Sequence, residues 1–259
     1  MGLGTSAAVV IGSFPLGESD RIVTFFSRDF GRIRGVAKSA RRLKSRFGGA
    51  LELFTLGQLV FFDTGRSDLV RIDHFDVTHP FAPLRENLET LGEAAWVAEI
   101  VGRTTGERDR QPALYGLLVR ALRALEVSTR PPRVAVCFGV RVLDVLGHRP
   151  RLDGCVECGR EYPFARPALG EGGLVCESCR DGGRPSGFGT DAVPVASATV
   201  AAFARLRGLR WEEAVASPIG RAGPELRAVL DSHLSRLIGQ PTRSGRFIRE
   251  VRRLSEVPE

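Results

Sequence analysis

The sequence predicts a multidomain α+β protein, in which an N-terminal five-stranded β-barrel precedes a helical domain with an inserted four-cysteine zinc module. Three observations support this fold class. Short runs rich in Val, Ile and Phe recur up to about residue 79, apolar residues then follow a helical period, and two Cys-x-x-Cys pairs interrupt the helical part. We expect domains at residues 1–79 and 80–259, with the insertion at about 150–189.

Five short strands separated by turn residues carry the barrel prediction. The expected strands span residues 7–11, 21–26, 32–37, 51–62 and 69–75. Glycine-containing turns lie between them, at Gly17, Gly31, Gly48-Gly49 and Gly65. A five-stranded barrel of this size is most economically an OB-fold, whose second and third strands and nearby loops form the usual oligonucleotide face.

Positive charge is concentrated at the third expected strand and beyond it. Residues 32–46 contain no acid, and their basic residues are Arg32, Arg34, Lys38, Arg41, Arg42, Lys44 and Arg46. Without these seven, basic and acidic residues are equal in number, so this segment accounts for the whole net charge of +7. Charge of this density indicates a polyanionic partner, and we predict that the seven residues bind nucleic acid. A solvated surface without a ligand is the alternative.

The basic segment divides into two parts. The alternation of Arg32, Ile33 and Arg34 predicts a strand that turns both arginines away from the barrel core. Residues 38–49, with two serines and two glycines, are expected to form a mobile loop that follows phosphates.

After residue 80 the apolar residues are spaced three and four apart, which predicts helices. The first pattern runs from Leu84 to Ala98, the second helix begins at Pro112, and the third ends before Gly147. Helical patterns resume at residues 197–206 and 226–237. The last segment, residues 243–254, is basic, with the arginines Arg243, Arg246, Arg249, Arg252 and Arg253 against one acid, Glu250.

Four of the five cysteines have the spacing of a tetrathiolate zinc site. Two Cys-x-x-Cys pairs are separated by 17 residues, and the ligands are Cys155, Cys158, Cys176 and Cys179. Four thiolates leave no open coordination position, so we expect one structural zinc ion. Arg160 and Arg180 are expected to offset part of the thiolate charge. A pair of redox motifs is the weaker alternative, and Cys137 is expected to be buried.

The sequence offers little for catalysis or for membrane insertion. It contains no phosphate-binding Walker loop, dinucleotide fingerprint or nucleophile elbow, and its four histidines are scattered. We therefore predict that the protein is not an enzyme. No apolar run approaches the ~20 residues of a membrane-spanning helix, and no signal peptide is evident, so we expect a cytoplasmic protein.

Three features together resemble the bacterial RecO family of recombination mediators, in the same order along nearly the whole chain. They are the run GESDRIVTFFSRDFGRIRGVAKSARRLKSRFGGALELFTL, the four-cysteine insertion and the terminal HLSRLIGQPTRSGRFIREVRRL. Ser39 stands where glycine is expected in many members. The intact cysteine set predicts a bound zinc ion.

The resemblance implies a DNA repair function without enzymatic turnover. Proteins similar to this one have an N-terminal OB-fold, bind single- and double-stranded DNA and anneal complementary strands. They engage the acidic C-terminal tail of single-stranded DNA-binding protein, and with RecR they load RecA. A bacterial, nucleoid-associated location follows from such a role.

Two other function classes are compatible with the residues. One is an RNA-binding or translation-associated protein with an OB-fold and a zinc ribbon, which would prefer RNA through 2′-hydroxyl contacts. The other is a metalloenzyme of nucleic-acid processing, which needs an open metal position that four thiolates do not leave.

Overall fold

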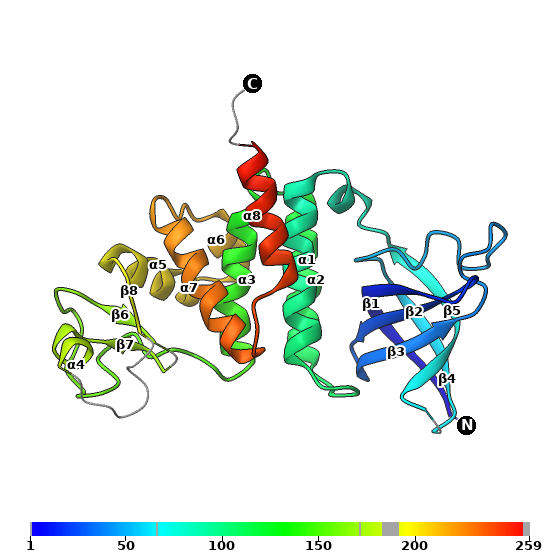
Figure 1. The fold of residues 1–259 in the computed structure, drawn as a ribbon, viewed down its shortest axis with the longest axis horizontal. Coiled ribbons are helices and arrows are strands. Elements are labelled where there is room, and N and C mark those ends of the chain that lie inside the picture. The colour runs from blue at the N-terminus through cyan, green and yellow to red at the C-terminus, as the bar shows by residue number, and fades with distance from the viewer. Residues whose placement is uncertain (1, 66, 171, 183–191, 256–259) are drawn as a thin grey trace. The chain divides into compact units, whose positions relative to one another are not determined.

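Five strands close into a barrel in the computed structural model (Figure 1). They are β1 (Gly2–Leu16), β2 (Asp20–Ser27), β3 (Gly31–Ala37), β4 (Leu56–Asp63) and β5 (Leu69–His79). The order is β1-β2-β3-β5-β4, with β4 returning to β1, and the β3–β5 pairing is parallel while the others are antiparallel. This is the five-stranded OB-fold topology, and the predicted fold class is confirmed.

Three strands differ clearly from their expected limits, and one of them, β5, continues past residue 75 to His79. β1 is much longer than residues 7–11, because its first part pairs with β4 and its second part with β2, with a register shift between Val10 and Gly12 where it bends. Residues 51–55 do not belong to β4 but form turns that lead into it. A strand that serves two partners shows no simple alternation, which explains the early end of the prediction.

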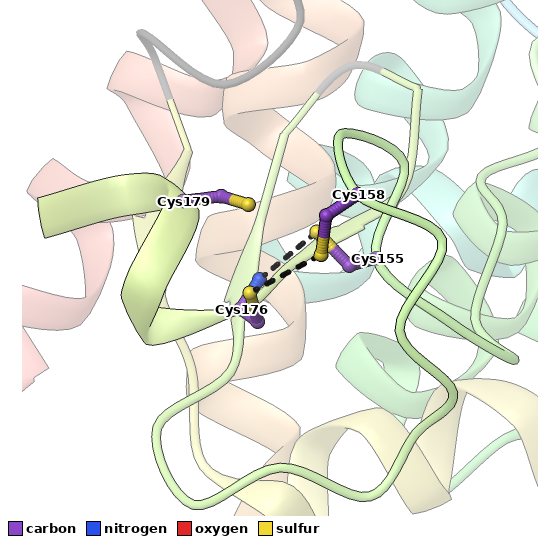
Figure 2. Close-up of side chains that lie close together, drawn as sticks. All are labelled: Cys155, Cys158, Cys176 and Cys179. Atoms are coloured by element: carbon purple, nitrogen blue, oxygen red, sulfur yellow. Dashed lines mark hydrogen bonds between the residues drawn. The ribbon is translucent and has the colours of Figure 1, made fainter. Parts of the chain in front are cut away.

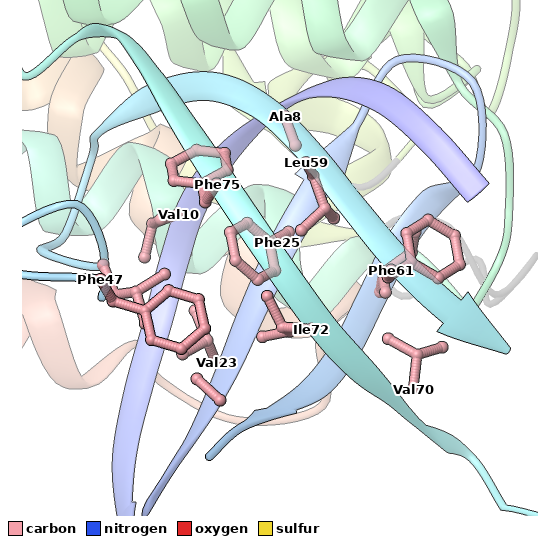
Figure 3. Close-up of a cluster of buried hydrophobic side chains, with 13 residues drawn as sticks. Ala8, Val10, Val23, Phe25, Phe47, Leu59, Phe61, Val70, Ile72 and Phe75 are labelled. Carbon is pink, nitrogen blue, oxygen red and sulfur yellow. The ribbon is translucent and has the colours of Figure 1, made fainter. Parts of the chain in front are cut away.

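The barrel core is a cluster of apolar side chains from all five strands and from the segment between β3 and β4 (Figure 3). Phe25 and Phe75 lie at its centre with ring centroids 5.1 Å apart. Phe47 and Leu51 come from outside the strands, yet both are buried in the same cluster. Figure 3 shows Phe47 at one end of the cluster and Phe61 with Val70 at the other.

The structure describes residues 2–65, 67–170, 172–182 and 192–255. By packing, the chain forms two units: residues up to Pro131 together with those from Arg243 onward, and residues 132–242. The predicted domain limits of 1–79 and 80–259 stay a prediction. The expected end of the cysteine insertion at residue 189 lies outside the described residues.

The first unit adds three α-helices and a short 3-10 helix to the barrel. They are η1 (Ala82–Arg85), α1 (Leu88–Thr104), α2 (Pro112–Val127) and α8 (Arg243–Ser255). Asn87 caps α1 by accepting hydrogen bonds from the backbone N–H groups of Glu89 and Thr90, and Pro112 occupies the first turn of α2, as predicted.

The second unit consists of α3 to α7 and a small three-stranded sheet. The helices are α3 (Pro131–Val145), α4 (Glu177–Asp181), α5 (Ser197–Gly208), α6 (Trp211–Ala216) and α7 (Ala222–Leu237). The sheet contains β6 (Ala168–Leu169), β7 (Leu174–Val175) and β8 (Val193–Pro194), in the order β7-β6-β8. Among the helices that the described residues form, none is long and apolar enough to cross a membrane.

Within the first unit, the α1–α2 loop (residues 105–111) packs against β3. The backbone N–H of Arg108 donates to the carbonyl of Arg32 at 2.9 Å, and its guanidinium pairs with Asp63 of β4. Gly31 makes this approach possible, because it has φ +64° and a Cβ there would lie 1.9 Å from the carbonyl oxygen of Asp109. The loop thus lies beside the first residues of β3, whereas residues Arg34–Val36 of β3 pair with β5.

Also in the first unit, α8 docks on α1 through a half-buried carboxylate. Glu99 accepts hydrogen bonds from the backbone N–H groups of Arg243 and Ser244 at 3.0 and 2.9 Å, and from the Ser244 hydroxyl at 2.6 Å. Burial opposes ionisation of Glu99, but these hydrogen bonds outweigh it and lower its pKa. The carboxylate therefore stays charged at neutral pH and satisfies the first N–H groups of α8.

We expect Gly31→Ala to destabilise the protein by about 2–5 kcal/mol, because a methyl group meets the Asp109 carbonyl and the residue keeps a left-handed backbone. Gly48→Ala is the matched control: Gly48 has φ +47° with nothing within 4 Å of its Cβ position. It should cost only about 1–2 kcal/mol. Urea unfolding measures both, and equal losses would contradict a steric role for Gly31.

Candidate nucleic-acid interface and metal centre

Residues 38–50 follow β3 as a series of tight turns. Backbone hydrogen bonds join residues three apart, from Arg42 to Ser39 at 3.2 Å, from Ser45 to Arg42 at 2.9 Å and from Ala50 to Phe47 at 2.8 Å. The buried ring of Phe47 attaches this segment to the barrel core. The expected loop therefore has a defined path, on which its basic side chains are held.

The start of this segment is tied to the β1–β2 turn. Asp20 accepts hydrogen bonds from the backbone N–H of Ser39 at 2.7 Å and from the Ser19 hydroxyl at 3.0 Å. The Ser39 hydrogen bond, then that of Ser19, then the charges of Lys38 and Arg42 hold the pKa of Asp20 below its ordinary value. Ser39 has φ +57°, a conformation that glycine adopts more readily.

The seven predicted nucleic-acid residues differ in availability. Lys38, Arg42 and Lys44 are exposed and make no ion pair with any residue that the structure describes. Arg41 is exposed and also donates to the Gly17 carbonyl at 2.8 Å. The four lie close together in sequence on the turns after β3, where they form a compact basic surface.

The other three predicted residues also contact the protein itself. Arg34 points outward and lies 3.4 Å from Glu107. Arg46 is exposed, donates to the Ile72 carbonyl at 3.4 Å and lies over the Phe47 ring. Arg32 faces outward as expected, but it is half-buried and its guanidinium donates to the Gly102 carbonyl at the end of α1. A phosphate contact by Arg32 stays a prediction.

A row of outward side chains crosses the barrel beside this basic surface. Strand register pairs Phe14 with Ile22, Ile22 with Val36, Val36 with Arg71, and Arg71 with Phe62. Partners in neighbouring strands share a face of the sheet. Phe14 is 60% exposed, and the Arg71 guanidinium lies 4.8 Å from the Phe62 ring centroid. This row, which we call the aromatic row, is placed where OB-folds bind single strands.

Phe14 and Arg71 escaped the sequence prediction. Phe14 lies beyond residue 11, where the first strand was expected to end, and its exposure follows from the bend in β1. Arg71 joins the face of β3 through the parallel β3–β5 pairing, a long-range contact without a local signal. A first strand predicted to extend to residue 16 would have included Phe14 as a surface residue of the barrel.

The four paired cysteines come together in the second unit. Cys155 and Cys158 lie on a turn closed by the backbone N–H of Gly159 donating to the Cys155 carbonyl at 3.0 Å, with Gly159 at φ +76°. Cys176 follows β7 and Cys179 lies in α4. The hydrogen bond from Val156 to the Leu174 carbonyl, at 2.8 Å, brings the first turn beside β7 and so beside the second pair.

The geometry of the cysteine cluster suits a metal ion. The four sulfur atoms lie within 4.8 Å of one another, and those of Cys158 and Cys176 are 3.8 Å apart. Figure 2 shows Cys179 facing the other three from α4. Tetrahedral zinc with bonds of about 2.3 Å places its sulfur ligands about 3.8 Å apart. These four residues could therefore hold one metal ion.

The thiols favour a cation by their electrostatics as well. Burial opposes ionisation of Cys155, but the backbone N–H groups of Cys176, Cys158 and Glu157 outweigh it and lower the pKa of Cys155 to about 7. Burial and the neighbouring cysteine sulfurs raise the pKa of Cys179. One thiolate forms readily while further ones repel each other, and a bound dication would relieve that repulsion.

Two expectations about nearby residues have different outcomes. Cys137 is buried as predicted, and burial raises its pKa to about 12, which makes it unreactive. Arg160 and Arg180 pair with carboxylates, Arg160 at 3.1 Å from Glu177 and Arg180 at 2.9 Å from Asp181, and their expected effect on the thiolate charge stays a prediction. The Arg160–Glu177 pair connects the first cysteine turn to α4, whereas Arg180 and Asp181 are neighbours within α4.

Comparisons with known proteins give a consistent result over most of the chain. Residues 1–81 match the family described as "Recombination protein O N terminal", and residues 85–246 match "Recombination protein O C terminal". The chain is 34% identical to DNA repair protein RecO of Anaeromyxobacter dehalogenans, with 94% of each chain covered. It is 32% identical to that of Geobacter sulfurreducens, with 94% of this chain and 96% of the relative covered, and 35% identical to that of Rubrobacter xylanophilus, with 90% and 92% covered.

Proposed function

Because the chain belongs to the RecO family of DNA repair proteins, we propose that it is a non-catalytic recombination mediator that binds single- and double-stranded DNA and anneals complementary strands. The observation that carries this proposal is the exposed basic surface of Lys38, Arg41, Arg42 and Lys44 beside the aromatic row of an OB-fold. Family membership favours this role over the RNA-binding alternative.

The two parts of the interface have different tasks in this proposal. The basic surface neutralises phosphates, which supplies affinity that depends on salt and on strand length and little on base sequence. The aromatic row gives unpaired bases an apolar surface, with Phe14 as the stacking residue. Arg71 belongs to the aromatic row and Arg34 lies two residues before Val36 on β3, so both add positive charge near the bases.

Annealing follows from the same charge. Two complementary single strands repel each other through their phosphates, and a basic surface that neutralises part of that charge lowers the cost of bringing them together. The protein transfers no group in this process and needs no catalytic residue. Its contribution is to hold strands at high local concentration.

The partners in this proposal rest on the family. With RecR, the protein promotes loading of RecA on DNA coated by single-stranded DNA-binding protein, and it engages the acidic C-terminal tail of that coating protein. Such a role places it with the nucleoid of a bacterial cell. The basic character of the chain, with a net charge of +7, suits an acidic tail as well as DNA.

The proposed metal is one structural zinc ion held by Cys155, Cys158, Cys176 and Cys179. Four thiolates complete a tetrahedral shell, so the ion would stabilise the fold and leave no position for water or substrate. Its binding would join the turn before β6 to the β7–α4 segment. A small module without a large core of its own gains much of its stability from such an ion.

The triple variant Arg41→Glu/Arg42→Glu/Lys44→Glu should bind single-stranded DNA at least about tenfold more weakly near 0.1 M salt. Its log–log salt slope should be smaller by about 2, because three phosphate contacts are lost. Fluorescence anisotropy across a salt series measures both quantities. The matched control is Arg120→Glu/Arg123→Glu/Arg130→Glu, which reverses three charges elsewhere. If the first variant keeps the salt slope and the affinity of the parent protein, the basic surface does not bind the DNA phosphates.

Phe14→Ala should weaken binding of single strands by about 5- to 150-fold, since stacking on one base is worth about 1–3 kcal/mol. The salt slope and the affinity for duplex should not change, because no phosphate contact is removed and paired bases do not stack on the protein. Leu16→Ala, an exposed apolar truncation on the same strand, is the control. If both variants bind single strands like the parent protein, Phe14 is not a stacking residue.

Elemental analysis of protein purified without chelator should find one zinc ion per chain. Cys176→Ser should abolish stoichiometric zinc and make the module sensitive to proteolysis, because three thiolates leave the tetrahedron incomplete. Cys137→Ala should retain the ion, since Cys137 lies outside the cluster. Parent protein without stoichiometric metal would refute the zinc assignment.

A further inference from the structure

The exposed face of α8 carries an array of arginines that the barrel interface does not use. Arg246, Arg249 and Arg253 are exposed and follow the spacing of one helix face, three and four residues apart. None of the three forms an ion pair with another residue in the described part of the chain. Glu250 is the one acidic residue in the sequence 243–253, so the helix carries an excess of positive charge.

The docking of α8 does not depend on these arginines. The opposite face of the helix holds it to α1, through the Glu99 hydrogen bonds to residues 243 and 244 and through Ile248, which is 4% exposed. Ile248 lies against Gly92 of α1, and a Cβ added to Gly92 would lie 2.9 Å from the Cγ1 atom of Ile248. The arginine side chains are thus presented to solvent on a helix that other contacts fix.

Helix stability gives no reason for basic residues at both ends of α8. Cations are favourable in the last turn of a helix but unfavourable in the first, where the macrodipole is positive. The first turn of α8 contains Arg243 and no acid of its own, with Arg246 immediately after it. Glu99 of α1 lies at the first N–H groups of α8 and offsets part of this cost, and an anionic partner would offset it further.

The spacing of the array fits a phosphate backbone. With a rise of 1.5 Å per residue, the seven steps from Arg246 to Arg253 cover about 10 Å along the helix. Phosphates of one strand recur about every 3.4 Å along a duplex axis, so the array spans about three of them. Guanidinium groups bind phosphate oxygens by paired hydrogen bonds, and such a line of them fits a regular polyanion.

α1 connects this array to the barrel inside the first unit. Near its C-terminal end, α1 meets the barrel at Gly102, whose Cβ position is 3.2 Å from Ile11, while Gly92 and Glu99 hold α8. The protein therefore has two basic arrays on different elements of one unit, the surface at residues 38–44 and the exposed face of α8. Annealing requires two strands to be held at once.

We propose that Arg246, Arg249 and Arg253 on α8 hold the backbone of a second DNA strand while the barrel interface holds the first. This rests on the proposed function in one respect, that the barrel binds single-stranded DNA. The α8 face acts through phosphates alone, so it accepts any sequence, and it raises the local concentration of the incoming strand without competing for the aromatic row.

The test compares first-strand binding with second-strand capture in the full chain. Arg246→Gln/Arg249→Gln/Arg253→Gln should bind a short donor-labelled single strand within about twofold of the parent protein. Its capture of a second, non-complementary strand labelled with an acceptor dye should fall at least tenfold, and so should its rate of annealing complementary strands. Arg120→Gln/Arg123→Gln/Arg130→Gln is the charge-matched control and should behave like the parent protein in both measurements.

The lysine variant Arg246→Lys/Arg249→Lys/Arg253→Lys keeps the charge and should retain most of the capture, which separates loss of charge from loss of fold. If the glutamine variant captures the second strand and anneals at the rates of the parent protein, the proposal is wrong. That result is also expected if the α8 arginines bind an acidic protein in place of DNA. Parent protein that binds no single strand at all would refute the proposed function itself. These two failures are distinguished by the first-strand measurement.

Discussion

The contact between the α1–α2 loop and β3 organises the first unit and decides which arginines remain for ligands. It requires the backbone of residues 108 and 109 to approach β3 closely, which Gly31 permits because it has no Cβ. The same contact draws Arg32 toward the Gly102 carbonyl and Arg34 toward Glu107. The basic residues after β3 lie beyond this contact and stay exposed.

Hydrophobic burial holds the basic surface in place. Phe47 and Leu51 belong to the segment between β3 and β4, and both are buried in the barrel core. Burying a side chain as large as phenylalanine contributes about 1.5–3 kcal/mol toward the entropy cost of ordering this segment. One stretch of chain therefore supplies charge to solvent and apolar side chains to the core, and Asp20 ties down its beginning.

In the second unit the cysteine cluster lies where two segments of a small module meet. The module around it has two-residue strands and a five-residue helix, so it has few apolar side chains with which to build a core. The two turns that carry the cysteines meet through backbone hydrogen bonds to β7 and through carboxylate–arginine pairs. Four thiols gathered at one point need a cation to be stable as thiolates, which joins the metal chemistry to the folding of the module.

The sequence by itself predicted the five-stranded barrel, the helical period after residue 80 and the two cysteine pairs that come together, because each depends on spacing within short stretches of chain. It also located the basic segment and the outward direction of Arg32 and Arg34. Tertiary structure alone decided that the Arg32 guanidinium donates to a carbonyl of α1 and that Phe47 is a core residue. It also decided that Phe14 and Arg71 lie on the same outer face of the barrel as Val36 of β3. These depend on strand register, the bend of β1 and the approach of the α1–α2 loop, which are contacts between residues far apart in the chain and leave no local pattern.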